Sequence, residues 1–307
     1  MIVSLVTGLI LFGLTFLQHG GFKRSISFNG GILFSIVMPP GTGKADLEKI
    51  ITSAGFQNPT VKLTNPRTNQ YDLELGPDVR DIIDDRIKKE EAASGIPKNV
   101  SERKTVSGEI EKLLFANIPG LSDESFISRE TIAASYGSDL WKMALTSLFW
   151  TLFLIGVYVS FRFDFPFALG ASLALLHDVI LTIGFIGAFQ IEPSVPVIAA
   201  VLTIVGYSMN DTIVIFDRIR ERLKEHVVAN IRDTMDNAIT QTLSRTMITS
   251  ALTMISVVAL LLGGAVSLRD FALVLLFGIF VGTYSSIFIA SHFVQYYEEI
   301  RAFIKKR

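Results

Sequence analysis

Long, uninterrupted apolar blocks constrain this chain more than any other feature of its sequence. Half of its 307 residues are hydrophobic, and many of them lie in continuous runs rather than on one face of amphipathic soluble helices. Because a helix rises about 1.5 Å per residue, a run of roughly 20 apolar residues crosses a hydrocarbon core of about 30 Å. The sequence therefore predicts an α-helical integral membrane protein with about six transmembrane helices.

The first apolar block, residues 1–19, lacks the positive start and the small-residue cleavage site of a secretory signal. We therefore expect it to be a retained first helix. Five further helices follow a long polar stretch and form a membrane domain over residues 139–307. Their expected bounds are Leu140–Phe161, Pro166–Phe189, Pro196–Phe216, Thr246–Leu262 and Phe271–Phe293.

The polar stretch, residues 20–138, has the pattern of a small α+β domain between the first and second membrane helices. Strand-like and helical runs follow in the order β-α-β-β-α-β, which is typical of a split βαβ domain. The expected strands are Gly31–Met38, Thr60–Leu63, Tyr71–Leu75 and Phe126–Ala133, and the expected helices are Ala45–Ala54, Asp78–Ala92 and Glu109–Ala116.

A charged stretch, residues 217–244, separates the fourth and fifth membrane helices. Apolar residues recur at every fourth position from Ile219 to Leu243, which predicts one amphipathic helix. Such a helix suits a membrane surface or the side of another helix, and a plain connector helix is the alternative. Since the stretch is rich in arginine, the positive-inside rule places it and both termini in the cytoplasm. The domain of residues 20–138 would then be periplasmic in a bacterial inner membrane, although two basic residues at the outer end of the first helix oppose this.

Ionisable residues inside apolar blocks are the candidates for function, because each costs about 2.5–3.5 kcal/mol on insertion scales. Asp211 lies in the fourth helix, roughly 9 Å inside its cytoplasmic end. Arg245 opens the antiparallel fifth helix at a similar depth. An ion pair between them would lower the desolvation cost of both, and protonation of Asp211 would release it. The alternatives are that Arg245 snorkels to the headgroups and that Asp211 makes a structural hydrogen bond.

Polar residues spaced by one helical turn accompany both members of this expected proton-coupling pair. Thr203 and Tyr207 share a helix face with Asp211, and a polar stripe runs from Arg245 along the fifth helix. Carboxylates and hydroxyls serve either H⁺ or Na⁺, so the coupling ion stays open. The expected supporting polar residues are Thr203, Tyr207, Asn210, Thr249 and Thr253.

His177 and Asp178 form a second candidate near the middle of the third helix, where snorkelling is hardest. An unperturbed histidine has a pKa of about 6.5, so the two residues could relay protons. Hydrogen bonds to backbone or to a polar stripe on another helix are the alternative. In the sixth helix, small residues at steps of four predict close helix packing without a chemical role. These residues are Gly278, Gly282 and Ser286.

Several function classes lack their sequence signals. The chain contains no cysteine, so disulfides and thiolate nucleophiles are excluded. The segment Gly41–Lys44 resembles part of a P-loop, but Ala45 stands where a serine or threonine is required. The four histidines are scattered and no basic patch is interleaved with aromatic residues. We therefore expect no enzyme activity, no metal, no cofactor and no nucleic-acid partner.

These motifs together resemble the SecF family of bacterial translocon accessory proteins. The matching segments are SFNGG at Ser27–Gly31, LLHD at Leu175–Asp178, VGYSMNDTIVIFDRIRE at Val205–Glu221, SRTMITS at Ser244–Ser250 and GTYSSIFIA at Gly282–Ala290. The resemblance implies a fold related to the resistance-nodulation-division transporters. It also implies a proton pathway between SecD and SecF helices, with Asp211 and Arg245 as its essential charged residues and a less defined role for Asp178.

The partners implied by this resemblance are SecD, the SecYEG channel, the translocating preprotein and membrane lipid. The implied function is proton-driven completion of preprotein export. Two alternatives remain open from the residues: a small-molecule or lipid exporter on the same helical scaffold, and a structural scaffold of the translocon that moves no protons.

Overall fold

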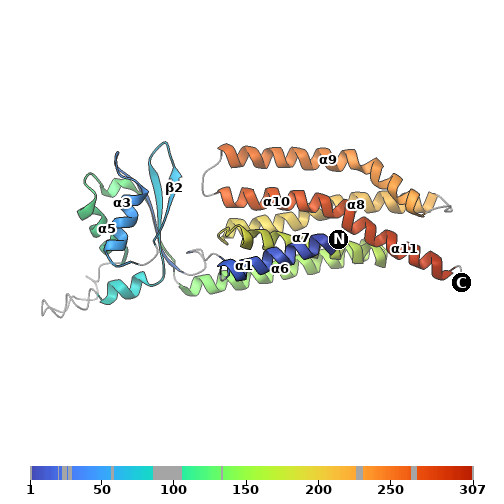
Figure 1. The fold of residues 1–307 in the computed structure, drawn as a ribbon, viewed down its shortest axis with the longest axis horizontal. Helices are drawn as coiled ribbons and strands as arrows, with labels where there is room; N and C mark the ends of the chain where they lie inside the picture. Colours follow the sequence, from blue (N-terminus) through green and yellow to red (C-terminus); the bar gives the residue numbers. More distant parts are fainter. Residues whose placement is uncertain are drawn as a thin grey trace. The chain divides into compact units, whose positions relative to one another are not determined.

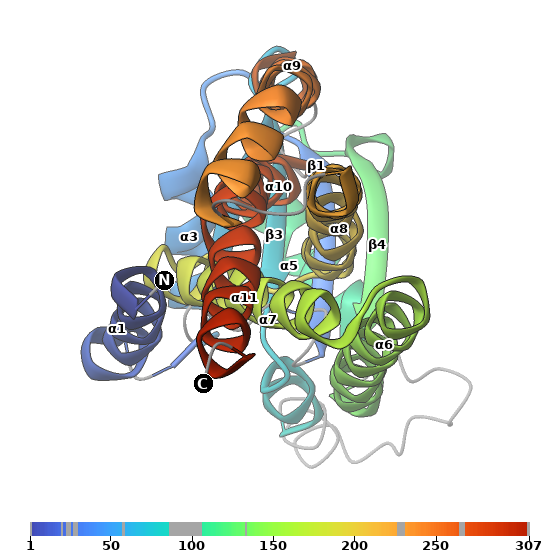
Figure 2. The ribbon, with the colours of Figure 1, turned by 90° about the vertical axis from the view of Figure 1, so that its right-hand side faces the viewer.

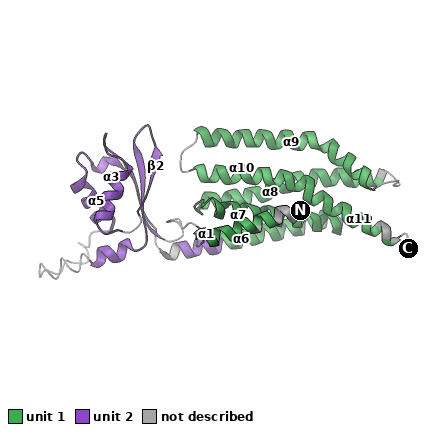
Figure 3. Cartoon of the chain, viewed as in Figure 1, with its two compact units in different colours: residues 1–23, 144–264, 268–307 green, residues 24–143, 265–267 purple. Residues whose placement is uncertain are grey.

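The chain forms two compact units in its computed structural model (Figure 1, Figure 3). The structure describes residues 2–19, 21–22, 26, 30–56, 59–85, 106–132, 134–225, 231–263 and 268–305. The larger unit comprises Met1–Lys23, Ala144–Gly264 and Leu268–Arg307, and the smaller one comprises Arg24–Met143 with Ala265–Ser267. The predicted class, a helical membrane protein with a small α+β part, is confirmed at this level.

The smaller unit is built on an antiparallel sheet of four strands. Its strand order is β2-β3-β1-β4, with every neighbouring pair antiparallel. In this arrangement β3 lies between β1 and β2, as a split βαβ unit requires. In chain order the elements are β1 (Gly31–Val37), α3 (Lys44–Ser53), β2 (Thr60–Asn65), β3 (Gln70–Leu75), a helical segment at 79–85, α5 (Val106–Asn117), η2 (Asp123–Ser125) and β4 (Phe126–Ile132).

One face of this sheet forms the core of the smaller unit. Burial alternates along β1 and β3, because successive side chains of a strand point to opposite faces. The buried side includes Phe34 and Leu73, and α3 and α5 cover it with Leu47 and Leu114 (Figure 1). Of the helix expected from position 78 to 92, residues 86–92 lie outside the described part of the chain.

The larger unit is a bundle of long helices. It contains α1 (Ile2–His19), α7 (Phe165–Ala188), α8 (Val195–Glu225), α9 (Ile231–Gly263), α10 (Arg269–Ser285), the π-helical turn η4 (Ser286–Ala290), α11 (Ser291–Lys305) and most of α6 (Ala134–Arg162). Within the described residues, five stretches are long and apolar enough to cross a membrane, and α1 contributes a shorter apolar run, Val6–Leu17. The five stretches are Gly137–Arg162, Phe165–Ala188, Val195–Lys224, Arg232–Gly263 and Arg269–Arg301.

Helices α7, α8 and α10 form the interior of this bundle. Buried residues make up 61% of the apolar window of α7 and 67% of that of α10 with its continuation, against 6% for α6 and 17% for α9. Helix α10 contacts α7, α8 and α9, and Figure 2 shows it among them, with α1 and α6 toward the outside. The buried polar residues of α7, α8 and α10 therefore face protein rather than lipid.

The charged stretch at residues 217–244 is not the single connector helix expected from its apolar periodicity. Helix α8 continues to Glu225 and α9 begins at Ile231, so the stretch is divided between the ends of two long helices. Ile219 and Met235 of its apolar stripe are buried in the bundle core and Leu223 and Ile239 pack against it, whereas Leu243 is exposed. Val227 lies outside the described residues. Of the two placements considered for the stripe, the side of another helix is the one observed.

Hydrogen bonds between α8 and α9 explain why both helices extend past their apolar parts. Arg218 and Arg222 of α8 donate to the Gln241 side chain of α9, at 2.8 Å from Nε and 2.9 Å from Nη2 respectively. Arg162 at the end of α6 forms an ion pair with Asp217 at 2.9 Å. A fall in hydropathy thus marks where these helices leave the apolar region and not where they end.

Candidate functional site

The first buried carboxylate, Asp178 of α7, is held by hydroxyl groups from two other helices. Ser208 of α8 donates to Oδ2 at 2.5 Å, and Ser285 of α10 donates to the same oxygen at 2.7 Å. His177 Nδ1 lies 2.9 Å from Oδ1. All four side chains are at most 1% exposed. Three helices therefore meet at one carboxylate in the interior of the bundle.

The second ring nitrogen of His177 is isolated. Nε2 is buried and has no hydrogen-bond partner among the described residues. With the proton on Nδ1, the imidazole donates a hydrogen bond to Asp178, and Nε2 is an acceptor without a donor. With the proton on Nε2, the Nδ1 acceptor would face the carboxylate oxygen of Asp178, which is also an acceptor. The geometry therefore favours the tautomer in which Nδ1 donates to Asp178.

The second buried carboxylate, Asp211 of α8, joins a network that includes α9 and α10. Its side chain is 3% exposed, and Ser250 of α9 donates to its Oδ2 at 3.3 Å. Ser250 Oγ lies 2.8 Å from Thr283 Oγ1 of α10 and 3.5 Å from the Tyr207 hydroxyl. The same hydroxyl lies 3.3 Å from Thr253 Oγ1. Ser250 is therefore the junction of this second network.

Arg245 lies outside this network. Its side chain is exposed, and it forms no direct ion pair with Asp211 in the part of the chain that the structure describes. The direct pair expected from the sequence is not formed, and Arg245 and Thr249 lie on the exposed side of α9. Thr246 and Ser250, each 1% exposed, occupy the inner face of α9 instead.

The predicted supporting residues divide into two groups. Tyr207 and Thr253 belong to the Ser250 network. Thr203 and Thr249 are exposed, and each donates to a backbone carbonyl of its own helix, at 2.7 and 3.0 Å. Asn210 is also exposed. Thr203 and Thr249 therefore lie on the surface of α8 and α9, outside the buried network, whereas the Asn210 side chain hydrogen-bonds to the neighbouring Asp211.

Small residues on α10 allow α10 to approach α8 closely. A Cβ atom on Gly278 would lie 2.1 Å from Cδ1 of Ile204, and one on Gly282 would lie 3.0 Å from Cβ of Ser208. Ser286 is fully buried, and its hydroxyl bonds to the Thr283 carbonyl at 3.0 Å. This close approach brings the α10 hydroxyls within reach of both carboxylate networks.

Four hydroxyl residues of the two networks were missed by the sequence reasoning. The sequence contains only a weak signal for them. Each lies close in sequence to a predicted site residue, but serine and threonine are common in apolar helices, and only the rotation of each helix shows which ones face inward. The four are Ser208, Ser250, Thr283 and Ser285.

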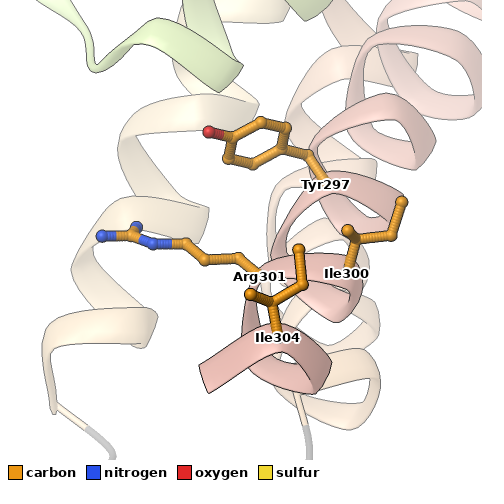
Figure 4. Close-up of a pocket in the computed structure, with 4 residues that line it drawn as sticks. All are labelled: Tyr297, Ile300, Arg301 and Ile304. Atoms are coloured by element: carbon orange, nitrogen blue, oxygen red, sulfur yellow. The ribbon is translucent and has the colours of Figure 1, made fainter. Parts of the chain in front are cut away.

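A hollow of about 430 Å³ lies along α11, away from these networks. Tyr297, Ile300, Arg301 and Ile304 line it, all from α11 (Figure 4). Arg301 is paired with Glu298 at 3.6 Å. The hollow contains none of the predicted site residues. Within the described ranges, no group of three or more His, Asp or Glu residues is placed to hold a metal ion.

Comparison with known proteins finds relatives over nearly the whole chain. Residues 114–300 match the family described as "Protein export membrane protein SecD/SecF, C-terminal". "Protein translocase subunit SecF" of Sebaldella termitidis is 36% identical over 291 residues, which cover 94% of this chain and 86% of that protein. The protein of the same description in Borreliella burgdorferi is 34% identical over 294 residues, which cover 95% and 92%.

The chain is also similar to longer proteins. "Protein translocase subunit SecDF" of Thermus thermophilus is 36% identical over 276 residues, which cover 89% of this chain and 34% of that protein. The crystal structure of SecDF from the same organism superposes with a TM-score of 0.73 at 32% identity, covering 96% of this chain and 37% of the other. The chain thus spans little more than a third of SecDF, but most of the separate SecF subunits.

Proposed function

Because this chain belongs to the SecD/SecF family of protein-export membrane proteins, we propose that it is the SecF-type subunit of a proton-driven protein translocase. The observation that carries this proposal is the presence of two buried carboxylates, Asp178 and Asp211, at junctions between the central helices of a membrane bundle. Buried charge at such positions is costly in a bilayer and is typical of proton or ion pathways.

Hydrogen bonding links the charge of each carboxylate to helix packing. An ionised Asp178 accepts hydrogen bonds from Ser208 on α8 and Ser285 on α10. A protonated carboxylic acid also donates, so part of this set must rearrange when a proton arrives. Since the hydroxyls belong to different helices, proton binding changes the contacts between helices. In the proposed cycle, the resulting helix movement is passed to the outer domain, which holds an emerging preprotein against backsliding.

A SecD-type partner would cover the exposed polar face of α8 and α9. Thr203, Asn210, Arg245 and Thr249 are exposed in this chain although they lie within apolar spans. The Thr203 and Thr249 hydroxyls bond to carbonyls of their own helices. Lipid tails cannot satisfy the Arg245 guanidinium or the whole Asn210 amide, whereas a second membrane protein or an enclosed water path can. The length of SecDF, of which this chain covers 37%, supports a larger assembly. In that assembly Arg245 would act at the interface, close to Asp211.

The remaining parts of the proposal concern topology and partners. α1 is the first of six membrane helices, both termini are cytoplasmic, and residues 20–138 face the periplasm of a bacterial inner membrane. The arginines at the ends of α8 and α9 support this orientation through the positive-inside rule. The partners are SecD, the SecYEG channel, the preprotein and the surrounding lipid.

The proposal is tested by preprotein translocation into vesicles that contain SecYEG and a SecD-type partner, with or without this chain. An imposed proton gradient should speed the late stage of translocation only when the chain is present. Stimulation that ignores every ion gradient would instead support a structural scaffold, and gradient-driven efflux of dyes or lipids without any effect on preprotein would support an exporter. A sodium gradient at constant pH distinguishes Na⁺ from H⁺ coupling.

A further inference from the structure

Helix α10 supplies one hydroxyl to each of the two carboxylate networks. Ser285 bonds directly to Asp178, at 2.7 Å, and Thr283 lies 2.8 Å from the Ser250 hydroxyl that bonds to Asp211. Both α10 side chains are buried. Residues two apart on an α-helix point about 200° apart, so Thr283 and Ser285 lie on opposite sides of α10. This matches the position of α10 between α9 and α7.

Each of these hydroxyls also has a second acceptor on its own helix. Thr283 Oγ1 lies 2.8 Å from the Ile279 carbonyl, and Ser285 Oγ lies 3.1 Å from the Gly282 carbonyl. A hydroxyl has a single proton to donate, so each side chain can bond either to the carboxylate network or to its own backbone. Each hydroxyl can therefore rotate from one acceptor to the other and still donate a hydrogen bond, so its buried proton is never left without a partner.

The helix changes its winding directly after this pair. The π-helical turn η4 begins at Ser286, and the Ser291 hydroxyl donates to the Ser286 carbonyl five residues earlier, at 3.0 Å. One additional residue in a helix rotates the following part by about 100°, and such turns are frequent at functional sites. The π-turn thus lets α11 keep its own contacts with α7 and α9 while Thr283 and Ser285 face the two networks.

We propose that Thr283 and Ser285 are positioning residues that connect the two carboxylates through α10. A change at Asp178 releases or recruits Ser285, α10 adjusts, and Thr283 changes its bond to Ser250 and so the surroundings of Asp211. The meaning of this link for transport rests on the proposed function, but the link itself is measurable on the purified protein.

The experiment is infrared spectroscopy of the carboxyl groups in the full-length protein reconstituted in lipid, with Asp178→Asn and Asp211→Asn used to assign the two bands. Ser285→Ala should shift the band of Asp178, and Thr283→Val that of Asp211. Ser172→Ala and Thr240→Val are matched controls, because among the described residues these hydroxyls bond only to carbonyls of their own helices, at 2.9 and 2.8 Å. They should shift neither band.

The connection through α10 is tested by the response of one carboxyl to removal of the other. Asp178→Asn should shift the Asp211 band, and adding Ser285→Ala should abolish that response. If the response survives Ser285→Ala but is lost with Ser208→Ala, the link runs through α8 and the assignment to α10 is overturned. Absence of any response also overturns it. Should the bands respond as expected while translocation ignores the proton gradient, the proposed function fails and the link stands.

Discussion

The close packing of α10 on α8 predicts that a single added methyl group at Gly278 destabilises the bundle. A Cβ atom there would lie 2.1, 2.4 and 2.9 Å from three side-chain carbons of Ile204. Ile204 is 1% exposed, so its side chain cannot turn into open space. Overpacking of this kind costs about 1–3 kcal/mol. We expect Gly278→Ala to lower the free energy of unfolding by about this amount.

A second glycine in the same bundle provides the control. Gly206 of α8 has no atom within 4 Å of the position that a Cβ would occupy. Since alanine favours a helix over glycine by up to about 1 kcal/mol, Gly206→Ala should leave the stability unchanged or raise it. The same chemical change is therefore expected to destabilise the bundle at Gly278 but not at Gly206.

The assay is reversible denaturant unfolding in mixed micelles, followed by circular dichroism. Ile204→Ala removes the atoms that the new methyl group would meet, so the double variant should lose less stability than the sum of the two single variants. The reasoning is refuted if Gly278→Ala unfolds at the wild-type midpoint, or if Gly206→Ala is destabilised to the same extent.

Three further predictions concern the sheet and the exposed arginine. Gly31→Ala should disrupt the sheet, because Gly31 has φ +140° and a Cβ there would lie 2.1 Å from the Leu75 carbonyl oxygen. Gly108→Ala on α5 is the control, because its Cβ would meet no atom within 4 Å. Limited proteolysis of the smaller unit should show faster cleavage for Gly31→Ala alone. Phe34 is fully buried, so Phe34→Ala should lower the free energy of unfolding of the smaller unit by about 3–5 kcal/mol. Proteolysis within residues 30–132 should then be faster, and an unchanged cleavage rate would contradict the assigned core. Arg245→Gln should change the free energy of unfolding by less than about 0.5 kcal/mol, because the side chain is exposed. It should nevertheless reduce the response of translocation to the proton gradient, and a wild-type response would exclude Arg245 from the proposed site.

Local patterns in the sequence were sufficient to predict the four strands and the five described helical stretches that are long and apolar enough to cross a membrane, while the sixth membrane helix stays a prediction. Alternation along residues 71–75 reflects a strand with one buried face, and the burial pattern of β3 agrees with it. Long apolar runs likewise reflect the thickness of a bilayer. Helix length was harder to predict, because α8 and α9 continue into a charged region where hydrogen bonds to Gln241 add to the packing of Ile219 and Met235.

The detailed partners of the two carboxylates could not be read from the sequence. Periodicity shows which residues share a helix face, but it does not show how far each helix is rotated in the bundle. Arg245 and Ser250 lie close together on α9, and only the observed rotation places Ser250 beside Asp211 and Arg245 on the outside. The π-turn at Ser286–Ala290 has no signature in the apolar pattern, although it adjoins Ser285.

The central claim is that a buried carboxylate couples the proton gradient to preprotein movement. The most direct measurement is the rate of late translocation with and without an imposed gradient, for wild type, Asp211→Asn and Asp236→Asn. Asp236 is an exposed residue of α9, so Asp236→Asn is a control that removes one carboxylate without touching the buried site. We predict that the gradient speeds translocation for wild type and Asp236→Asn and has no effect for Asp211→Asn. An equal response from all three proteins would contradict the claim.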